Sequence, residues 1–562
     1  MAYVVTQPCC ADASCVLACP VNCIHPAPGE PGFAEAEMVY IDPRSCVGCG
    51  ACATACPVDA IKPEAALRPA EQVFAAVNAE YYDVFPHPDR TPLAVVGRQR
   101  RLVGDRPARS VRVAVVGAGP AGLYTADELL RHPEVAVDVL DRLPTPYGLL
   151  RAGVAPDHPH TKQAERLFAQ IESQPGFRYL LGAEVGADLD HAELAARYDA
   201  VVYAVGAATD RRLGLPGEDL RGSCSATEVV GWYNGQPDHA DLATTGALDL
   251  GHHRVVVVGN GNVALDAARV LTASPERLAG TDIAGPAYDA LARSAVQEVV
   301  VLGRRGPAQA AFTLPELLGL QALAETGEVD VVVDTGGAPL GGSAVERVLA
   351  GLADAPRLPG RRRVVLRFLT APRAVVGEDG HVTGLEVVRT RLVDDADGVP
   401  RAVPTDDVET IPTGTVLRSV GYHGRPVPGL PFDEATGTVP HERGRVAPGT
   451  YVVGWIKRGP TGFLGTNKTD AQETVSTILD DLDAGTAVRV GEVAGPTELL
   501  HLLRGRGVVV HSRRGWRAID AEERRRGGDE GRTRSKIVRR VELDDVASGA
   551  RRRRRYAGRP RR

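Results

Sequence analysis

The sequence predicts the α/β fold class, with a small α+β unit at the N-terminus and two larger α/β domains after it. Two glycine-rich turns, at residues 117–122 and 259–264, each separate an apolar strand from an amphipathic helix. Nine of the ten cysteines lie before residue 57. A chain of 562 residues is too long for one hydrophobic core, so we expect three or four domains.

The composition is that of a globular protein, with 44% hydrophobic and 24% charged residues. No run of about 18 apolar residues occurs, so a membrane span is not expected. The N-terminal residues MAYVVTQPCC lack the charged and apolar regions of a secretion signal. We therefore expect a cytoplasmic, reducing location, where clustered cysteines favour metal or redox chemistry over disulfides.

The second cysteine run has the spacing of an iron–sulfur ligand set. Cys46, Cys49, Cys52 and Cys56 form C-x2-C-x2-C-x3-C-P. This is the ligand run of bacterial ferredoxins, whose fourth cysteine binds the other cluster in proteins with two clusters. Structural zinc usually takes two separated cysteine pairs, so the compact run favours iron–sulfur over zinc.

The first run repeats this spacing with one exchange, because Asp12 stands where the second cysteine is expected. Two such runs predict an α+β ferredoxin fold with two clusters over residues 1–62. Because the fourth cysteine of each run binds the other cluster, the 4Fe–4S cluster is assigned to Cys19, Cys46, Cys49 and Cys52. The same rule assigns the second cluster to Cys9, Cys15 and Cys56, with Asp12 at the fourth corner.

Asp12 decides the type of the second cluster. Three thiolates hold a 3Fe–4S cluster, whereas a carboxylate can hold the fourth iron of a 4Fe–4S cluster, although oxygen is the weaker partner for it. Asp12 is therefore either a labile ligand or a residue beside a three-iron cluster, and we favour the three-iron cluster. Cys10 could replace Cys9 as the ligand, but the spacing favours Cys9.

Residues 1–62 resemble the seven-iron bacterial ferredoxins. One departure is the insertion HPAPGEPGFAEAEM between the two runs, which we expect to be a surface loop. Cys23 resembles the extra, non-ligating cysteine that many of these ferredoxins keep near a cluster, and Cys224 is expected to be a buried structural thiol. Seven acidic and two basic residues in 1–64 predict docking on basic redox partners.

The first glycine-rich turn lies in VRVAVVGAGPAGLYTADELL, residues 111–130. Gly117, Gly119 and Gly122 form G-x-G-x-x-G, which lets a helix N-terminus meet a pyrophosphate. The next strand, VAVDVLD, ends at Asp141, which is placed to bind a ribose hydroxyl. The pattern resembles FAD-binding folds of the flavoprotein disulfide-reductase type more than NAD dehydrogenases.

The second glycine-rich turn lies in RVVVVGNGNVALDAARVL, residues 254–271. Arg304 and Arg305 follow the next strand, where an acidic residue would bind the ribose of NAD. Two arginines instead suit the 2′-phosphate of NADP, which takes planar bidentate donors. The two turns therefore predict Rossmann-like domains for FAD and for NADP(H).

Four blocks in order resemble the adrenodoxin reductase-type ferredoxin–NADP reductases: PTPYGLLRAGVAPDHPHTK, GNGNVALDAARVL, GRRGPAQAAFT and YVVGWIKRGPTGFLGTNKTD. The fused N-terminal ferredoxin resembles the actinobacterial two-domain form of that family. The resemblance implies an enzyme that takes hydride from NADPH onto FAD. Single electrons then pass through the attached clusters to an acceptor such as a ferredoxin or a haem monooxygenase.

The resemblance also implies the residues of both nucleotide sites. For FAD they are the glycine turn with Ala121, and Asp141, Leu149, Val185, Trp455, Gly462, Phe463 and Leu464. For NADP they are Asn260, Gly261, Asn262, Val263, Arg304, Arg305 and Glu316. His158 and Glu228 resemble polar residues near the flavin that relay or tune protons, and a structural hydrogen bond is the equal alternative for each.

The FAD domain is expected to be discontinuous. We expect the ferredoxin unit over 1–62, a proline-rich linker with a short helical stretch over 63–109, the FAD domain over 110–207 and 419–488, the NADP domain over 208–418, and a C-terminal extension over 489–562. The arginine-rich end of that extension is expected to be a solvated tail and not a nucleic-acid site.

Two other classes of function fit parts of the pattern. One is an NADPH-, FAD- and Fe–S-containing electron-input protein that resembles the small subunit of glutamate synthase. The N-terminal cysteines of that subunit lack the double run found here. The other is a non-enzymatic iron–sulfur redox sensor, against which the paired nucleotide turns argue.

Overall fold

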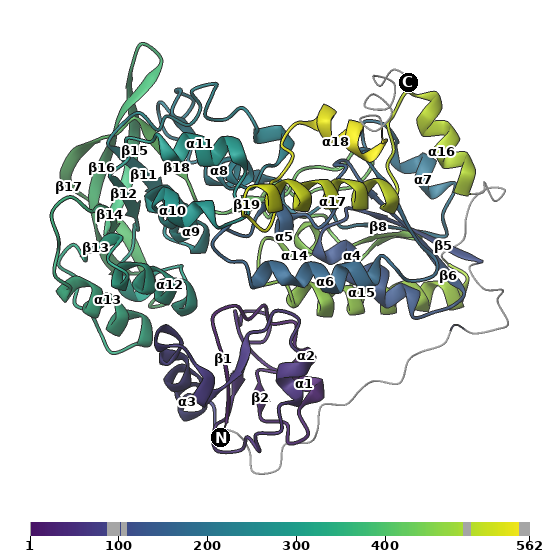
Figure 1. Cartoon of the computed structure of the whole chain (residues 1–562), viewed down its shortest axis with the longest axis horizontal. Coiled ribbons are helices and arrows are strands. Elements are labelled where there is room, and N and C mark those ends of the chain that lie inside the picture. The colour runs from purple at the N-terminus through teal and green to yellow at the C-terminus, as the bar shows by residue number, and fades with distance from the viewer. Residues whose placement is uncertain (1, 87–101, 103–109, 487–495, 550–562) are drawn as a thin grey trace, which may run out of the picture.

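The N-terminal unit lies against the junction of two large α/β domains. The computed structural model describes residues 2–86, 102, 110–486 and 496–549. Figure 1 shows the two large domains side by side, with the N-terminal unit below their junction and the helices α17 (Arg513–Asp529) and α18 (Arg540–Ala547) on the opposite side. The arginine-rich end and nearly all of residues 87–109 lie outside the described residues.

The N-terminal unit repeats the order strand, helix, strand. Its outer strands pair antiparallel with Val4 opposite Lys62, and its inner strands pair with Ile24 opposite Ile41. The two helices have five residues each and begin at equivalent places in the two cysteine runs. The elements are β1 (Tyr3–Val5), α1 (Ser14–Ala18), β2 (Ile24–His25), β3 (Tyr40–Ile41), α2 (Ala51–Ala55) and β4 (Ile61–Pro63).

The N-terminal unit continues beyond its expected end at residue 62, since two 3-10 turns (Glu64–Ala66 and Pro69–Glu71) lead into α3 (Val73–Val84), which packs on it. The buried Asn78 side chain accepts hydrogen bonds from the backbone N–H groups of Val5 (3.1 Å) and Ile41 (3.0 Å). A helix that satisfies strand backbone groups belongs to the same folded unit. The first part of the expected linker is therefore structural.

The insertion between the cysteine runs is a loop with many exposed residues, as expected, but two of its apolar side chains are buried. Phe33 is 4% exposed and Met38 1% exposed, and both belong to the core of the N-terminal unit. Glu37 reaches one of the large domains (domain 2, residues 208–418), where it accepts a hydrogen bond from Asn262. The insertion is thus anchored by the buried side chains of Phe33 and Met38 and by the hydrogen bond between Glu37 and Asn262.

Domain 1 contains a six-stranded sheet built from both ends of the chain, in the order β20-β21-β8-β5-β6-β7. All six residues of β5 are buried, as expected for a valine-rich central strand covered on both faces. The parallel pairing of β21 with β8 places Val452 opposite Tyr203 and makes the domain discontinuous. The strands are β5 (Val111–Val116), β6 (Val135–Asp141), β7 (Phe177–Leu181), β8 (Ala200–Tyr203), β20 (Arg445–Ala447) and β21 (Thr450–Val452).

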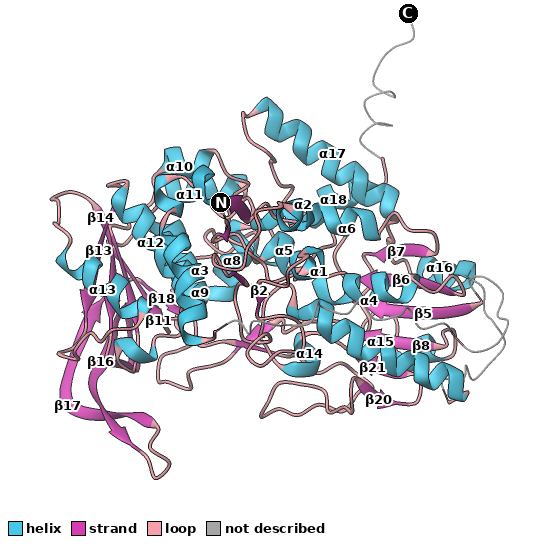
Figure 2. Ribbon diagram, turned by 90° about the horizontal axis from the view of Figure 1, so that it is seen from below, coloured by secondary structure: helices cyan, strands magenta, loops and turns pink. Residues whose placement is uncertain are grey.

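The helices of domain 1 connect these strands and cover the sheet (Figure 2). The long helix α15 packs along α4, beside the N-terminal unit. The helices are α4 (Pro120–Leu130), α5 (Leu149–Ala152), α6 (Glu165–Ile171), α7 (His191–Ala195), α14 (Trp455–Arg458) and α15 (Thr466–Ala484), with a 3-10 turn at Thr161–Ala164.

Domain 2 contains a parallel six-stranded sheet in the order β10-β18-β11-β12-β14-β13. Its strands are β10 (Ser223–Ser225), β11 (Arg254–Val258), β12 (Glu298–Leu302), β13 (Val329–Asp334), β14 (Arg362–Arg367) and β18 (Thr415–Arg418). An antiparallel sheet of β15 (Thr370–Glu378), β16 (His381–Asp394) and β17 (Pro400–Pro412) is attached to it. Its helices are α8 (Ala226–Tyr233), α9 (Asn262–Thr272), α10 (Pro275–Ala279), α11 (Gly285–Ala292), α12 (Leu314–Glu325) and α13 (Ala344–Asp354), with 3-10 turns at Pro237–His239 and Pro307–Gln309.

Two connections join the large domains. The chain passes from domain 1 to domain 2 through β9 (Thr209–Asp210) and returns through β19 (Tyr422–His423), and these two strands pair antiparallel. The C-terminal segment adds α16 (Pro496–Gly505), α17 and α18, and Trp516 and Ile519 of α17 are buried in the core of domain 1. Among the described residues, no helix is long and apolar enough to cross a membrane.

Candidate functional site

One cavity of the N-terminal unit brings together the four cysteines expected to hold the 4Fe–4S cluster. Cys19 comes from the first run, and Cys46, Cys49 and Cys52 come from the second. They line an empty volume of about 280 Å³, and all ten cysteines of the chain are free thiols. Cys23 lies at the same cavity, with its sulfur 3.5 Å from that of Cys19. Four thiols around one cavity are a donor set that fits a cubane cluster.

A second cavity of about 270 Å³ brings together Cys9, Cys15 and Cys56, with Cys10 and Asp12 also in its wall. Burial raises the pKa of Cys9 to about 12 and the pKa of Cys15 well above its usual value. These thiols therefore stay protonated without a cation, and binding of iron would release their protons. The three thiols fit a cluster that takes three protein ligands.

The two halves of the unit have matching geometry around Asp12 and Cys49. Ala13 precedes α1 with φ 60°, and Gly50 precedes α2 with φ 76°. Asp12 therefore occupies the position in the first half that Cys49 occupies in the second. This equivalence supports the alignment of the two cysteine runs.

The Asp12 carboxylate is held by donors of the protein itself. Its Oδ1 accepts hydrogen bonds from the Ser14 N–H (3.2 Å) and the Ser14 hydroxyl. Its Oδ2 accepts from the Tyr124 hydroxyl (3.2 Å) and the Lys468 ammonium (3.3 Å), both on domain 1. A carboxylate whose two oxygens are engaged in this way is poorly available to a metal.

The second cavity faces domain 1 at the segment before α15. The Gly465 N–H donates to the Cys10 carbonyl oxygen at 2.9 Å. A Cβ on Gly465 would lie 1.6 Å from the Ala11 carbonyl oxygen, so the two backbones are in direct contact. Gly465 follows Gly462, Phe463 and Leu464, which are expected near the flavin. The structure thus places the second cluster cavity beside the expected flavin segment.

The first glycine turn fits a dinucleotide. Gly117 has φ 112°, and a Cβ there would lie 2.3 Å from the Ala204 carbonyl oxygen. A Cβ on Gly122 would lie 2.0 Å from the Gly117 carbonyl oxygen. Gly119 precedes α4, whose free N–H groups suit a pyrophosphate, and Ala121 is in the first turn of that helix. Asp141 ends β6 and accepts from the Ala118 N–H at 2.8 Å, which places its carboxylate at the same turn.

The remaining residues expected to contact FAD lie on several segments of domain 1. Leu149 begins α5 and Trp455 begins α14. The Trp455 Nε1–H donates to the Thr461 carbonyl oxygen at 3.1 Å, and its ring lies 5.0 Å from that of Tyr422. Gly462 has φ 78°, the Phe463 N–H donates to the Thr466 hydroxyl at 3.0 Å, and Leu464 packs on the domain core. Val185 follows β7 in a short bridge to Leu189.

The second glycine turn, at residues 259–264, has the same backbone geometry as the first glycine turn at Gly117. Gly259 has φ 111°, and a Cβ there would lie 2.1 Å from the Ser419 carbonyl oxygen. Asn260 and Gly261 follow it, and Asn262 and Val263 begin α9. The Asn262 Oδ1 accepts from the Thr313 N–H at 2.8 Å.

Arg304 and Arg305 follow β12 at the carboxyl end of the parallel sheet. Arg304 is exposed and Arg305 is half-buried. Neither guanidinium forms an ion pair with any residue that the structure describes. Both therefore remain available to an anionic ligand at the edge of the sheet where dinucleotides bind.

His158 and Glu316 meet in a charged cluster between the large domains. The buried Arg269 guanidinium contacts the His158 imidazole, and it pairs with Glu316 (2.8 Å), Asp157 (3.0 Å) and Asp266 (2.5 Å). Burial and the Arg269 charge lower the pKa of His158, so the imidazole is neutral at physiological pH. Sequence reasoning missed Arg269, because an arginine inside a helix carries no signal of its role.

Glu228 does not join this cluster. It lies in the first turn of α8, where its carboxylate accepts a hydrogen bond from the Ser225 N–H at 2.8 Å, and Ser225 caps the same helix. This is the reciprocal capping arrangement that stabilises helix N-termini. The structure thus shows the structural hydrogen bond that was the alternative for Glu228, and a proton role for this residue stays a prediction.

Two family models match the chain. The pyridine nucleotide-disulphide oxidoreductase model matches residues 111–304, and the 4Fe-4S binding domain model matches residues 39–62. Among curated proteins, a probable ferredoxin/ferredoxin–NADP reductase of Mycobacterium tuberculosis is 48% identical, covering 98% of this chain and 96% of the relative. The human mitochondrial NADPH:adrenodoxin oxidoreductase is 41% identical, covering 76% of this chain and 90% of the relative.

A solved structure agrees. FprA of Mycobacterium tuberculosis in complex with NADPH superposes with a TM-score of 0.73 at 43% identity, over 79% of this chain and all of FprA. The predicted α/β fold class with an N-terminal ferredoxin-like unit is confirmed. This chain belongs to the family of ferredoxin–NADP reductases that carry a ferredoxin at the N-terminus.

Proposed function

We propose that this chain is an NADPH-dependent flavoprotein that passes electrons from NADPH to its own N-terminal ferredoxin unit and from there to a redox protein. One observation carries the proposal: the backbone contact between Gly465, beside the expected flavin segment, and Cys10, at the second cluster cavity. Flavin, when bound, accepts hydride and returns electrons singly, which links nicotinamide to iron–sulfur chemistry. The contact would keep donor and acceptor domains together during that exchange.

The residues of each nucleotide site would bind and orient their ligand. The N–H groups at the start of α4 and α9 would bind the two pyrophosphates, and Asp141 would accept from a ribose hydroxyl. Arg304 and Arg305 would bind the 2′-phosphate that distinguishes NADPH from NADH. His158 would stay neutral, with Nε2 accepting from the Arg269 guanidinium and Nδ1 facing the Gln7 amide at 3.3 Å.

Replacing both Arg304 and Arg305 with alanine is expected to lower the preference for NADPH over NADH by roughly 10²-fold, because charge-assisted hydrogen bonds to the 2′-phosphate are lost. The measurement is kcat/KM for both nucleotides with an artificial one-electron acceptor. Arg293→Ala, at another exposed arginine of domain 2, is the control and should leave the preference unchanged. An unchanged preference in the double variant would show that the 2′-phosphate binds elsewhere.

The second cavity would hold a three-iron cluster. The support is the hydrogen bonding of Asp12, whose oxygens are engaged by Ser14, Tyr124 and Lys468. Asp12→Asn keeps the shape and should leave the oxidised three-iron EPR signal in place. Asp12→Cys supplies a fourth thiolate and should convert the centre to a four-iron type after reconstitution with excess iron. A three-iron signal that persists in Asp12→Cys would contradict the alignment of the two cysteine runs.

The redox partner would dock where the first cavity reaches the surface. Val47 and Cys49 line this cavity, Val47 is 62% exposed and Cys49 is exposed as well. The second cavity, by contrast, faces domain 1, where the Gly465 N–H donates to the Cys10 carbonyl oxygen. The acidic charge of residues 1–64 suits a basic partner, whose approach would be faster at low salt.

A further inference from the structure

The N-terminal unit also touches the nucleotide turn of domain 2. Glu37, at the end of the insertion, accepts a hydrogen bond at Oε1 from the Asn262 side chain at 3.2 Å. Asn262 is the first residue of the eleven-residue helix α9, and its own Oδ1 is oriented by the Thr313 N–H. The second oxygen of Glu37, Oε2, is buried and has no hydrogen-bond partner.

A second contact joins the N-terminal unit to domain 1. The Gln7 side chain lies 3.3 Å from Nδ1 of His158, whose other ring nitrogen contacts Arg269. Gln7 lies two residues before Cys9 of the second cluster cavity. The N-terminal unit thus contacts Asn262 at the nucleotide turn and His158 in the charged cluster between the large domains.

Negative charge is concentrated around Glu37. Asp266 of α9 and Glu316 of α12 both raise the pKa of Glu37, after burial as the largest cause, to about 8. Arg269 of α9 pairs with both of these carboxylates, and His158 lies against Arg269. On the N-terminal unit itself, Tyr40 is the neighbouring titratable group. Near neutral pH the Glu37 carboxyl is therefore largely protonated, and its charge appears as the pH rises through about 8.

We infer that Glu37 makes the N-terminal unit part of the NADP(H) site, so that docking of this unit and binding of the anionic nucleotide are coupled. Glu37 is a positioning residue that holds Asn262 at the start of α9, and its ionised form opposes nucleotide phosphates. By linkage, a nucleotide bound at the turn favours the protonated form of Glu37 in return. This inference rests on the nucleotide site of the proposed function.

The test compares Glu37→Gln with the wild-type holoprotein by NADP⁺ titration, followed by the flavin absorbance, at pH 7 and pH 9. This range lies above the second pKa of a phosphate monoester, about 6, so the ligand keeps its charge. In the wild type, NADP⁺ should bind more weakly at pH 9, by up to about tenfold if binding shifts the Glu37 pKa by one unit. In Glu37→Gln that extra weakening should be absent. Glu35→Gln, at an exposed acid of the same insertion, should behave as the wild type.

A second measurement needs no variant. Hydrogen exchange of residues 26–38 in the wild type should change on addition of NADP⁺, because the insertion touches the turn that binds it. Identical pH dependence of NADP⁺ affinity in the wild type and Glu37→Gln, with no exchange difference in the insertion, would overturn the inference. If Arg304→Ala and Arg305→Ala leave NADP⁺ affinity unchanged, the NADP(H) site of the proposed function is wrongly placed, which is a different result from failure of the Glu37 inference.

Discussion

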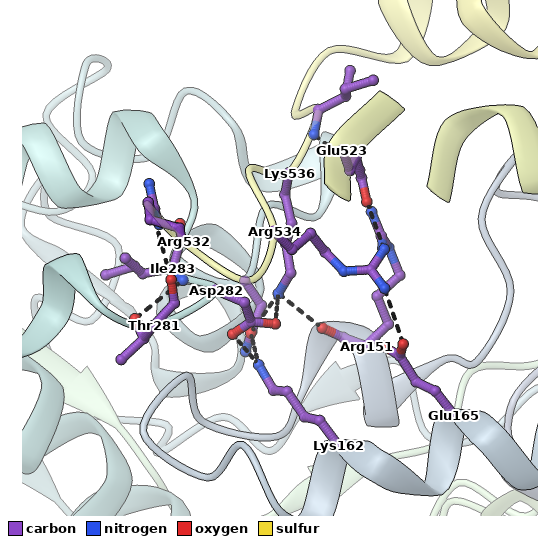
Figure 3. Close-up of polar contacts among 12 residues, drawn as sticks. Arg151, Lys162, Glu165, Thr281, Asp282, Ile283, Glu523, Arg532, Arg534 and Lys536 are labelled. Atoms are coloured by element: carbon purple, nitrogen blue, oxygen red, sulfur yellow. Dashed lines mark hydrogen bonds and ion pairs between the residues drawn. The ribbon is translucent and has the colours of Figure 1, made fainter. Parts of the chain in front are cut away.

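Replacing Glu523 with glutamine is expected to lower the free energy of unfolding by about 3–5 kcal/mol, the usual cost of removing one partner from a buried ion pair. Glu523 is 0% exposed. Its carboxylate accepts from Arg151 of α5 (2.6 Å), from Arg534 (2.9 Å) and from the Ile537 N–H (2.9 Å), as Figure 3 shows for the two arginines. Glutamine keeps the shape but removes the counter-charge that Glu523 gives the buried Arg151 guanidinium, whereas Arg534 keeps its ion pairs with Glu165 and Asp520.

The control for this prediction is the neighbouring residue. Glu522→Gln removes ion pairs to Arg525 and Arg526 at a partly exposed position and should cost less than about 1 kcal/mol. Urea unfolding of the holoproteins, followed by circular dichroism and by flavin fluorescence, gives both values. Equal losses in the two variants would show that the buried cluster contributes no more than the surface pairs.

The loss of stability in Glu523→Gln is expected to affect both large domains, because the chain beyond Glu523 contacts both of them. The Lys536 ammonium pairs with Asp282 of domain 2 (3.0 Å) and donates to the Arg151 carbonyl oxygen of domain 1 (3.3 Å). Asp282 also pairs with Lys162 of domain 1 (2.6 Å), and Figure 3 shows the two lysines on either side of it. The C-terminal segment thus opposes relative movement of the domains whose bound nucleotides must meet.

Replacing Gly465 with alanine is expected to separate the N-terminal unit from domain 1 without unfolding either. Gly465 has φ −68° and ψ −30°, a conformation that any residue adopts, so the added Cβ strains nothing within domain 1. The same Cβ would lie 1.6 Å from the Ala11 carbonyl oxygen and 2.5 Å from the Asp12 nitrogen. Backbone atoms cannot rotate away, so the contact must open.

The expected result is a fall of roughly 10²-fold in the rate at which NADPH reduces the iron–sulfur centres, because a small displacement of reacting groups has effects of this size. Stopped-flow absorbance separates this rate from reduction of the flavin, which at saturating NADPH should stay near the wild-type value. Gly351→Ala, on α13 with open space around the site, is the matched control. Unchanged cluster reduction in Gly465→Ala would mean that this contact does not position the N-terminal unit.

The sequence predicted best those features that are determined by residues close together along the chain. The strand–turn–helix units at Gly117 and Gly259 and the spacing of the cysteine runs are local patterns, and the fold class inferred from them is confirmed. The boundary at residue 62 stays a prediction, and the packing of α3 on the unit beyond it is recognised only through the contacts of Asn78.

Contacts between distant segments could not be predicted. Glu37 and Asn262 are 225 residues apart, and Arg151 and Glu523 are 372 residues apart. A buried ion pair depends on the final packing of both partners, and neither member carries a local signal. The hydrogen bonds of Asp12 to Tyr124 and Lys468 belong to the same class, and they supply the support for a three-iron cluster that spacing alone could not.

The central claim is that electrons reach the iron–sulfur centres within one chain. The most direct test mixes NADPH with the oxidised holoprotein over a tenfold range of protein concentration and follows the centres by freeze-quench EPR. A docked, covalently attached ferredoxin predicts a rate constant that is independent of protein concentration. A rate constant that rises in proportion to protein concentration, or centres that stay oxidised while the flavin is reduced, would contradict the claim.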